Sequence, residues 1–197
     1  MLDGPFLWYL NRSTGMVILV LFTLSTALGV LSTRGNAGKG VPKFVTQSLH
    51  RNIALLSVSL LVAHIVTAVV DTFVDIRWWQ AIVPFYGSTY LPQWLGLGTV
   101  AFDVIVVITL TSLVRDRLSH RLWRGLHLFS YVAWAVSVAH GIGIGTDIKA
   151  GATWAYAIVG GCVAVVLAAV GLRVGQLAAA SAVARVDPGA RSSGVGT

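Results

Sequence analysis

Apolar residues along this chain are gathered into five blocks, each about twenty residues long, and polar residues fall mainly in the connections between the blocks. The blocks do not alternate as a half-buried strand does, and their length suits a helix that crosses a hydrocarbon core about 30 Å thick. We therefore expect an all-α integral membrane protein, a bundle of five transmembrane helices. The expected helices span about 15–32, 49–70, 95–114, 124–143 and 153–173.

The segments outside these blocks carry weaker signals. Residues 1–14 place amphipathic aromatic side chains ahead of the first block, which indicates an interfacial N-terminal segment rather than a cleaved signal peptide. The connection before the third block is rich in tryptophan and tyrosine and predicts a short helix along the membrane surface at about 76–83. Residues 174–197 are rich in Ala, Ser and Gly and predict a largely disordered tail. We thus expect one folded transmembrane domain, at 15–173.

Composition narrows the class of protein further. Of the 197 residues, 56% are hydrophobic and 11% are charged, against about 25% charged in a soluble domain. The net charge of +7 does not indicate a nucleic-acid partner, because the basic residues are dispersed among the apolar blocks. Glutamate is absent, which argues against a carboxylate-rich di-metal site. The single cysteine, Cys162, lies in an apolar block, where we expect a small core residue rather than an iron–sulfur ligand.

Lysine and arginine are divided unequally between the two sides of the predicted bundle. The positive-inside rule makes the richer side cytoplasmic, so we expect the N-terminus outside and the C-terminus in the cytoplasm of a multi-pass protein of the cell (plasma or inner) membrane. The helices at 49–70 and 124–143 then both run from inside to outside and are parallel. The richer side holds eleven of the 14 basic residues, Arg34, Lys39, Lys43, Arg51, Arg115, Arg117, Arg121, Arg124, Arg173, Arg185 and Arg191, and the other side holds Arg12, Arg77 and Lys149.

These two parallel helices carry two histidines each. His50 and His64 are separated by about 3.9 turns and about 21 Å of rise, so their rings lie on nearly one face, and His127 and His140 lie at matching depths. Haem b takes two axial imidazoles and needs no covalent anchor. We therefore expect two b haems, the inner one held by His50 and His127 and the outer one by His64 and His140. A lone intramembrane histidine commonly bonds a neighbouring helix, but four at paired depths are harder to explain in that way.

The second pair of histidines departs from this geometry. The interval between His127 and His140 is one residue shorter than the interval between His50 and His64. On an ideal helix the side chains of His127 and His140 therefore point about 140° apart. We expect a locally altered pitch, different rotamers or rotated haem planes to compensate. Ser130 and Ser137 are candidates to stabilise such a distortion by bonding backbone carbonyls.

Further polar residues accompany the four candidate ligands. Arg51 and Arg124 flank the inner pair, where their guanidinium groups either meet haem propionates or serve only as positive-inside anchors. His120 is expected in a loop, although it is also an alternative inner ligand. Asp103 is the only acid well inside a predicted span. We expect it to bond a neighbouring helix, for example at Thr67, with proton movement as the alternative.

The pattern resembles the ferric reductase-like transmembrane domain family. That family includes the membrane parts of NADPH oxidases and ferric reductases and the haem-binding subunit of the bacterial periplasmic methionine sulfoxide reductase system. The resemblance implies transmembrane electron transfer through haem b, usually from the cytoplasm outward. It covers about 12–173 and is carried by Leu49-His50-Arg51 with His64, and by Arg121-Leu-Trp-Arg-Gly-Leu-His127 with His140-Gly141.

The sequence departs from the large enzymes of that family in lacking FAD and NAD(P)H domains, so we expect no hydride transfer from a nicotinamide. The leading hypothesis is an oxidoreductase membrane subunit. It would take electrons from a separate flavoprotein or from quinol and pass them to an outer acceptor that the sequence does not identify. Two alternatives stay open: a quinol-oxidising cytochrome b coupled to proton movement, and a haem-free membrane scaffold or transporter subunit.

Overall fold

The computed structural model describes residues 5–32, 42–71 and 74–186. Every regular element in these ranges is a helix, and five of the helices are long and apolar enough to cross a membrane. The expected all-α class and the five candidate spans are therefore confirmed. In order, the elements are α1 (Pro5–Ser32), α2 (Lys43–Val70), η1 (Trp78–Ala81), α3 (Pro92–Leu113), η2 (Arg115–Arg117), α4 (His120–Ile144), α5 (Thr146–Lys149) and α6 (Thr153–Val186).

Two helices extend well past their expected ends. α1 begins at Pro5, so the expected interfacial segment is part of the first helix from that residue onward. α6 continues to Val186 instead of ending at 173. The alanine-rich sequence after 173 has high helix propensity, which explains why it does not form the expected disordered tail. The remainder of that tail, 187–197, lies outside the described residues.

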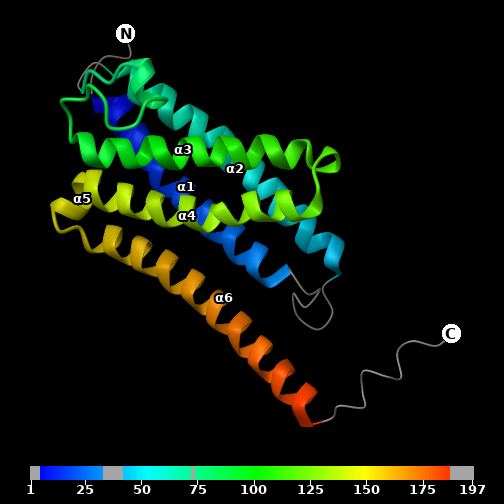
Figure 1. Ribbon diagram of the computed structural model, residues 1–197. Helices are drawn as coiled ribbons and strands as arrows, with labels where there is room; N and C mark the ends of the chain where they lie inside the picture. Colours follow the sequence, from blue (N-terminus) through cyan, green and yellow to red (C-terminus); the bar gives the residue numbers. More distant parts are fainter. Residues whose placement is uncertain (1–4, 33–41, 72–73, 187–197) are drawn as a thin grey trace.

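The long helices form two antiparallel hairpins (Figure 1). α1 packs against α2 and α3 packs against α4, while α6 lies along α1 on the outside of the bundle. α2 and α4 run in the same direction, from the end that holds η2 toward the end that holds α5. The two histidine-bearing helices are therefore parallel, as expected.

The buried apolar core lies between α1, α4 and α6. Cys162 of α6 is buried in it among Leu19 and Val138, in agreement with its expected role as a small core residue. α2 contributes little to this core, because its buried side chains within the described part of the chain are Thr46 and Ser57. α2 is thus held to the bundle mainly by its contacts with α1.

Polar contacts join α4 and α5 to α1. Trp134 of α4 donates its indole N–H to Thr23 Oγ1 at 3.0 Å. Arg12 forms an ion pair with Asp147 of α5, and its guanidinium carbon lies 4.1 Å from the centre of the Trp8 ring. In lipid, where apolar burial does little to drive association, packing and such bonds fix the positions of helices.

The connection between α2 and α3 folds back over α3. It contains the 3₁₀ helix η1, within the range where a short helix was expected. Thr99 Oγ1 donates to the Gln80 carbonyl at 2.8 Å, and Phe85 packs against Gly96. The location of η1 at a membrane surface stays a prediction.

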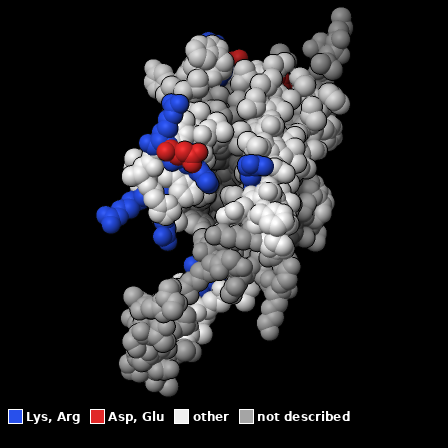
Figure 2. All heavy atoms as spheres, turned by 90° about the vertical axis from the view of Figure 1, so that its right-hand side faces the viewer, with Lys and Arg blue, Asp and Glu red and all other residues white. Residues whose placement is uncertain are grey.

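Arginine side chains gather at the opposite end of the bundle. Figure 2 views this end, where blue side chains surround a small red group. In η2, Asp116 pairs with Arg115 at 3.5 Å. The exposed basic residues here are Arg51, Arg115, Arg117, Arg121 and Arg124.

We predict that the Trp134–Thr23 bond couples α4 to α1 energetically. Trp134→Phe and Thr23→Val should each lower the unfolding free energy, and the double variant should lose less than the sum of the two. The expected coupling is about 0.6 kcal/mol, the average for such bonds between membrane helices. Unfolding of the detergent-solubilised protein measures it, and additive losses would show that the two side chains do not interact.

Candidate functional site

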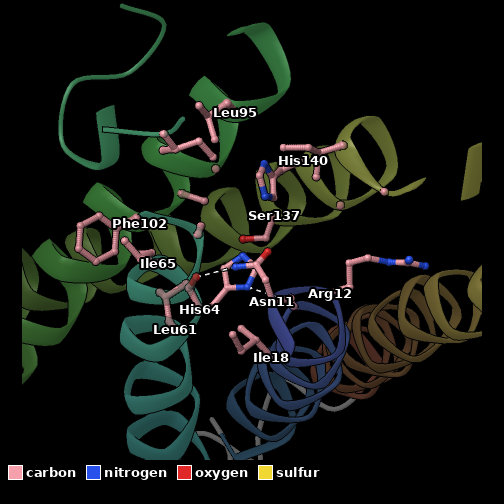
Figure 3. A pocket seen from close by; sticks show the side chains of 18 of the residues that line it. Asn11, Arg12, Ile18, Leu61, His64, Ile65, Leu95, Phe102, Ser137 and His140 are labelled. Carbon is pink, nitrogen blue, oxygen red and sulfur yellow. Dashed lines mark hydrogen bonds between the residues drawn. The ribbon is translucent and has the colours of Figure 1, made fainter. Parts of the chain in front are cut away.

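The four candidate ligands lie on the two parallel helices and face one another in two layers. In the inner layer, the rings of His50 and His127 have centroids 6.2 Å apart and planes inclined by 68°. In the outer layer, His64 and His140 line one cavity from opposite helices (Figure 3). The structure therefore brings together the residues of each expected pair.

The separation of the inner rings has a simple chemical meaning. Metal–imidazole bonds are about 2.0–2.1 Å long, so two imidazoles on opposite sides of one ion have ring centres about 6 Å apart. His50 and His127 have that separation. The inner layer has the spacing for one ion shared by two imidazoles.

Three of the four rings use Nδ1 to bond a backbone carbonyl of the partner helix. A carbonyl oxygen only accepts, so Nδ1 carries the proton in each of them and Nε2 keeps its lone pair. A metal-bound histidine usually has this arrangement, with the second ring nitrogen donating to a carbonyl or carboxylate. The bonds are His50 to Ser25 O (2.9 Å), His64 to Asn11 O (3.0 Å) and His140 to Trp94 O (2.7 Å).

Each of the three accepting carbonyls is followed four residues later by a glycine that packs against the same ring. Positions i and i+4 lie one above the other on a helix face, so a side chain at i+4 would lie against the ring, with crowding that decreases from Gly98 to Gly15 and Gly29. A Cβ at Gly98 would lie 2.6 Å from His140 Cε1, one at Gly15 3.2 Å from His64 Cε1, and one at Gly29 3.5 Å from His50 Cε1.

Asn11 holds the outer histidine of α2 from two directions. Its carbonyl accepts from the ring, and its side-chain amide donates to the His64 carbonyl at 2.7 Å and to Thr67 Oγ1 at 3.2 Å. Thr67 in turn donates to the His64 carbonyl at 2.9 Å. The expected bond between Asp103 and Thr67 is therefore wrong, because the Thr67 hydroxyl is engaged by α1 and by its own helix.

His127 is held differently from the other three. Its Nδ1 lies 3.5 Å from the Ser112 hydroxyl, and its ring stacks on Trp123 with centroids 5.1 Å apart and planes inclined by 25°. α4 is α-helical throughout, so no change of helix type compensates for the shorter histidine spacing. Ser137 donates to the Ala133 carbonyl at 2.8 Å, but α4 shows no change of helix type for this bond to stabilise.

The outer cavity has a volume of about 230 Å³ and lies between the two hairpins. Its lining is mainly apolar and includes Phe22, Leu61 and Phe102. The polar residues of the lining include Arg12, which Figure 3 shows extending away from the two rings. Arg12 Nε and Thr146 Oγ1 are buried there without a hydrogen-bond partner in the described ranges. Buried polar atoms without a hydrogen-bond partner are uncommon in native proteins, although the Arg12 guanidinium also pairs with Asp147.

The remaining candidate residues lie at the margin of the site. Arg51 and Arg124 are exposed, and no ion pair involves either of them within the part of the chain that the structure describes. Their role toward a cofactor stays a prediction. His120 begins α4, is exposed and lies 6.1 Å from the Trp123 ring. Among the ring contacts of the described residues, His50 lies against His127, whereas His120 lies against Trp123.

The described residues contain no group of three or more His, Cys or Asp side chains placed to hold a metal. Two imidazoles alone make a poor cage for a free ion, but they are the complete protein contribution to a bis-histidine haem. The carbonyl and glycine partners of the rings were not recognised from the sequence. The available signal was the repeat of Asn11-x₃-Gly15 as Ser25-x₃-Gly29, at the same spacing as His50 and His64.

We predict that Gly98→Ala lowers the unfolding free energy by about 1–3 kcal/mol, because the new methyl group displaces the His140 ring in a packed site. Gly29→Ala should be tolerated, since the methyl group there makes an ordinary contact. Gly125→Ala, with open space around it, is the matched control and should be neutral or stabilising. Thermal unfolding measures all three, and equal behaviour of Gly98→Ala and Gly125→Ala would contradict the proposed contact.

Comparison with known proteins places the chain in a family. Residues 6–147 match the family described as Domain of unknown function (DUF8596). Neither the curated proteins nor the solved structures gave a match. The matched range contains all four paired histidines, their carbonyl partners and the neighbouring glycines. The chain belongs to the DUF8596 family.

Proposed function

We propose that this chain is a transmembrane electron-transfer subunit that binds two b haems, one between His50 and His127 and one between His64 and His140. The observation that carries the proposal is the commitment of Nδ1 in three of the four rings to backbone carbonyls, which leaves Nε2 available as an axial ligand. The ring separation in the inner layer and the shared cavity in the outer layer agree with it.

The residues around the rings suit such a cofactor. Haem supplies an iron that gains and loses one electron without bond cleavage. The carbonyls of Asn11, Ser25 and Trp94 orient the imidazoles and strengthen them as ligands. The mainly apolar lining of the outer cavity suits an apolar ring system. Arg51 and Arg124, which are exposed, would serve an acidic group of the cofactor at the inner end.

The distribution of charge supports an orientation for this transfer. Exposed arginines gather at the η2 end (Figure 2), which the positive-inside rule makes cytoplasmic. The N-terminus then lies outside, and the His50–His127 layer faces the cytoplasm of a plasma or inner membrane. A separate flavoprotein or quinol would donate electrons on that side, and an acceptor of unidentified chemistry would take them outside. This arrangement is similar to that of the ferric reductase-like transmembrane domains.

We predict a reduced-minus-oxidised b-type spectrum and two haems per chain in the purified protein. His50→Ala and His64→Ala should each reduce the content to about one haem, because a bis-histidine site loses one of its two axial ligands. Haem extraction and quantification against protein measure this. His120→Ala is the control and should keep both haems.

A protein without a b-type spectrum would refute the proposal. Full haem retention in a His64→Ala/His140→Ala double variant would refute the assignment of the outer pair. If His50→Ala kept both haems and His120→Ala lost one, the assignment of the inner haem to His50 would be wrong.

We also predict that the η2 end faces the cytoplasm. In a Cys162→Ser background, Tyr86→Cys should react with a membrane-impermeant maleimide in intact cells, since Tyr86 is exposed on the α2–α3 connection. Arg117→Cys should react only after the cells are permeabilised. The reverse pattern would invert the proposed orientation.

A further inference from the structure

Asp103 is an acid near the middle of α3 whose carboxyl group has no hydrogen-bond or ion-pair partner among the described residues. No hydrogen bond or ion pair joins its carboxyl group to any other residue in 5–32, 42–71 or 74–186. Its neighbours Phe102 and Ile105 line the outer cavity, but Asp103 does not. It therefore lies on a different face of α3 from the one that meets the paired histidines.

The same face continues as an exposed apolar stripe. Val107 is 47% exposed and Leu110 is 58% exposed, and both follow Asp103 at helical spacing. In the other direction Phe85 packs on Gly96, and Thr99, which also borders the outer cavity, bonds the Gln80 carbonyl. The α2–α3 connection thus covers this face along the first turns of α3 and leaves it uncovered from Asp103 onward.

An acid in this position is costly if lipid surrounds it. Acidic side chains within membrane spans almost always face a bundle interior or an aqueous cavity and pair with other groups. α3 lies at the edge of the bundle away from α6 (Figure 1). We therefore expect the Asp103 carboxyl group to accept a hydrogen bond from a donor outside the described chain.

We propose that this face of α3 is a docking surface for a transmembrane helix of a different protein, which carries a lysine or arginine at mid-membrane depth opposite Asp103. Charge complementarity identifies the partner's chemistry. A second copy of this chain does not supply it, because the described arginines Arg12, Arg51, Arg124 and Arg173 lie toward the ends of the spans. The proposal does not depend on haem binding.

The test uses the full-length protein reconstituted in phosphatidylcholine vesicles with fluorescently labelled synthetic helices. One probe is a leucine-rich single-span helix with a central lysine, and the other has leucine at that position. Energy transfer should show that the wild-type protein binds the lysine helix about tenfold more tightly than the leucine helix. Asp103→Leu should abolish the preference and Asp103→Asn should weaken it.

Ser59→Leu is the matched control, since it removes an exposed polar group from another span and should keep the preference. Equal binding of both probes by the wild-type protein would overturn the proposal even if a variant failed to fold. Preference retained in Asp103→Leu would also overturn it. Cross-linking of two copies through Val107→Cys in a Cys162→Ser background would assign the face to self-association instead. None of these readouts involves haem, so a failure here leaves the electron-transfer proposal untouched.

Discussion

The bond between a histidine ring and a backbone carbonyl of the neighbouring helix is the constraint on which this fold depends. Inside a membrane an imidazole N–H without a partner is costly, since no water replaces the missing bond. Helix carbonyls already accept one N–H each, so the ring must approach the second lone pair of the oxygen closely. Glycine one turn further along the helix permits that approach. At Gly98 and Gly15 a larger residue would crowd the ring, so the close approach of the helices depends on glycine there, whereas at Gly29 a methyl group would make an ordinary contact.

These bonds determine how each hairpin closes. α1 and α2 are antiparallel, and Asn11 with His64 and Ser25 with His50 pair in one register because both sets share the same spacing. The same motif, Trp94 followed by Gly98, aligns α3 with α4 at the outer end. Each hairpin is thus fixed internally, and the rings face the space between the two hairpins. A group bound there would add contacts for α2, which is otherwise poorly buried.

The features that could be predicted from the sequence are those that depend only on the order and spacing of residues along the chain. Block length gives the spans, charge distribution gives an expected orientation, and the spacing of His50 and His64 gives their common face. Features that depend on tertiary partners were missed. Asn11 and Arg12 looked like polar residues ahead of the membrane, yet contacts with His64 and Asp147 accommodate them within α1. The Thr67 hydroxyl looked available to Asp103, but α1 uses it.

The two layers are not equivalent, and the difference originates in one spacing. His127 lies one residue closer to His140 than a strict repeat of the first pair requires, and α4 stays a regular helix. Its ring therefore relies on Trp123 for position and meets the Ser112 hydroxyl in place of a carbonyl. A hydroxyl both donates and accepts, whereas a carbonyl only accepts. Among the four rings, His127 is consequently the one whose hydrogen-bond partner does not determine whether Nδ1 carries the proton. It belongs to the layer nearest the arginine-rich end.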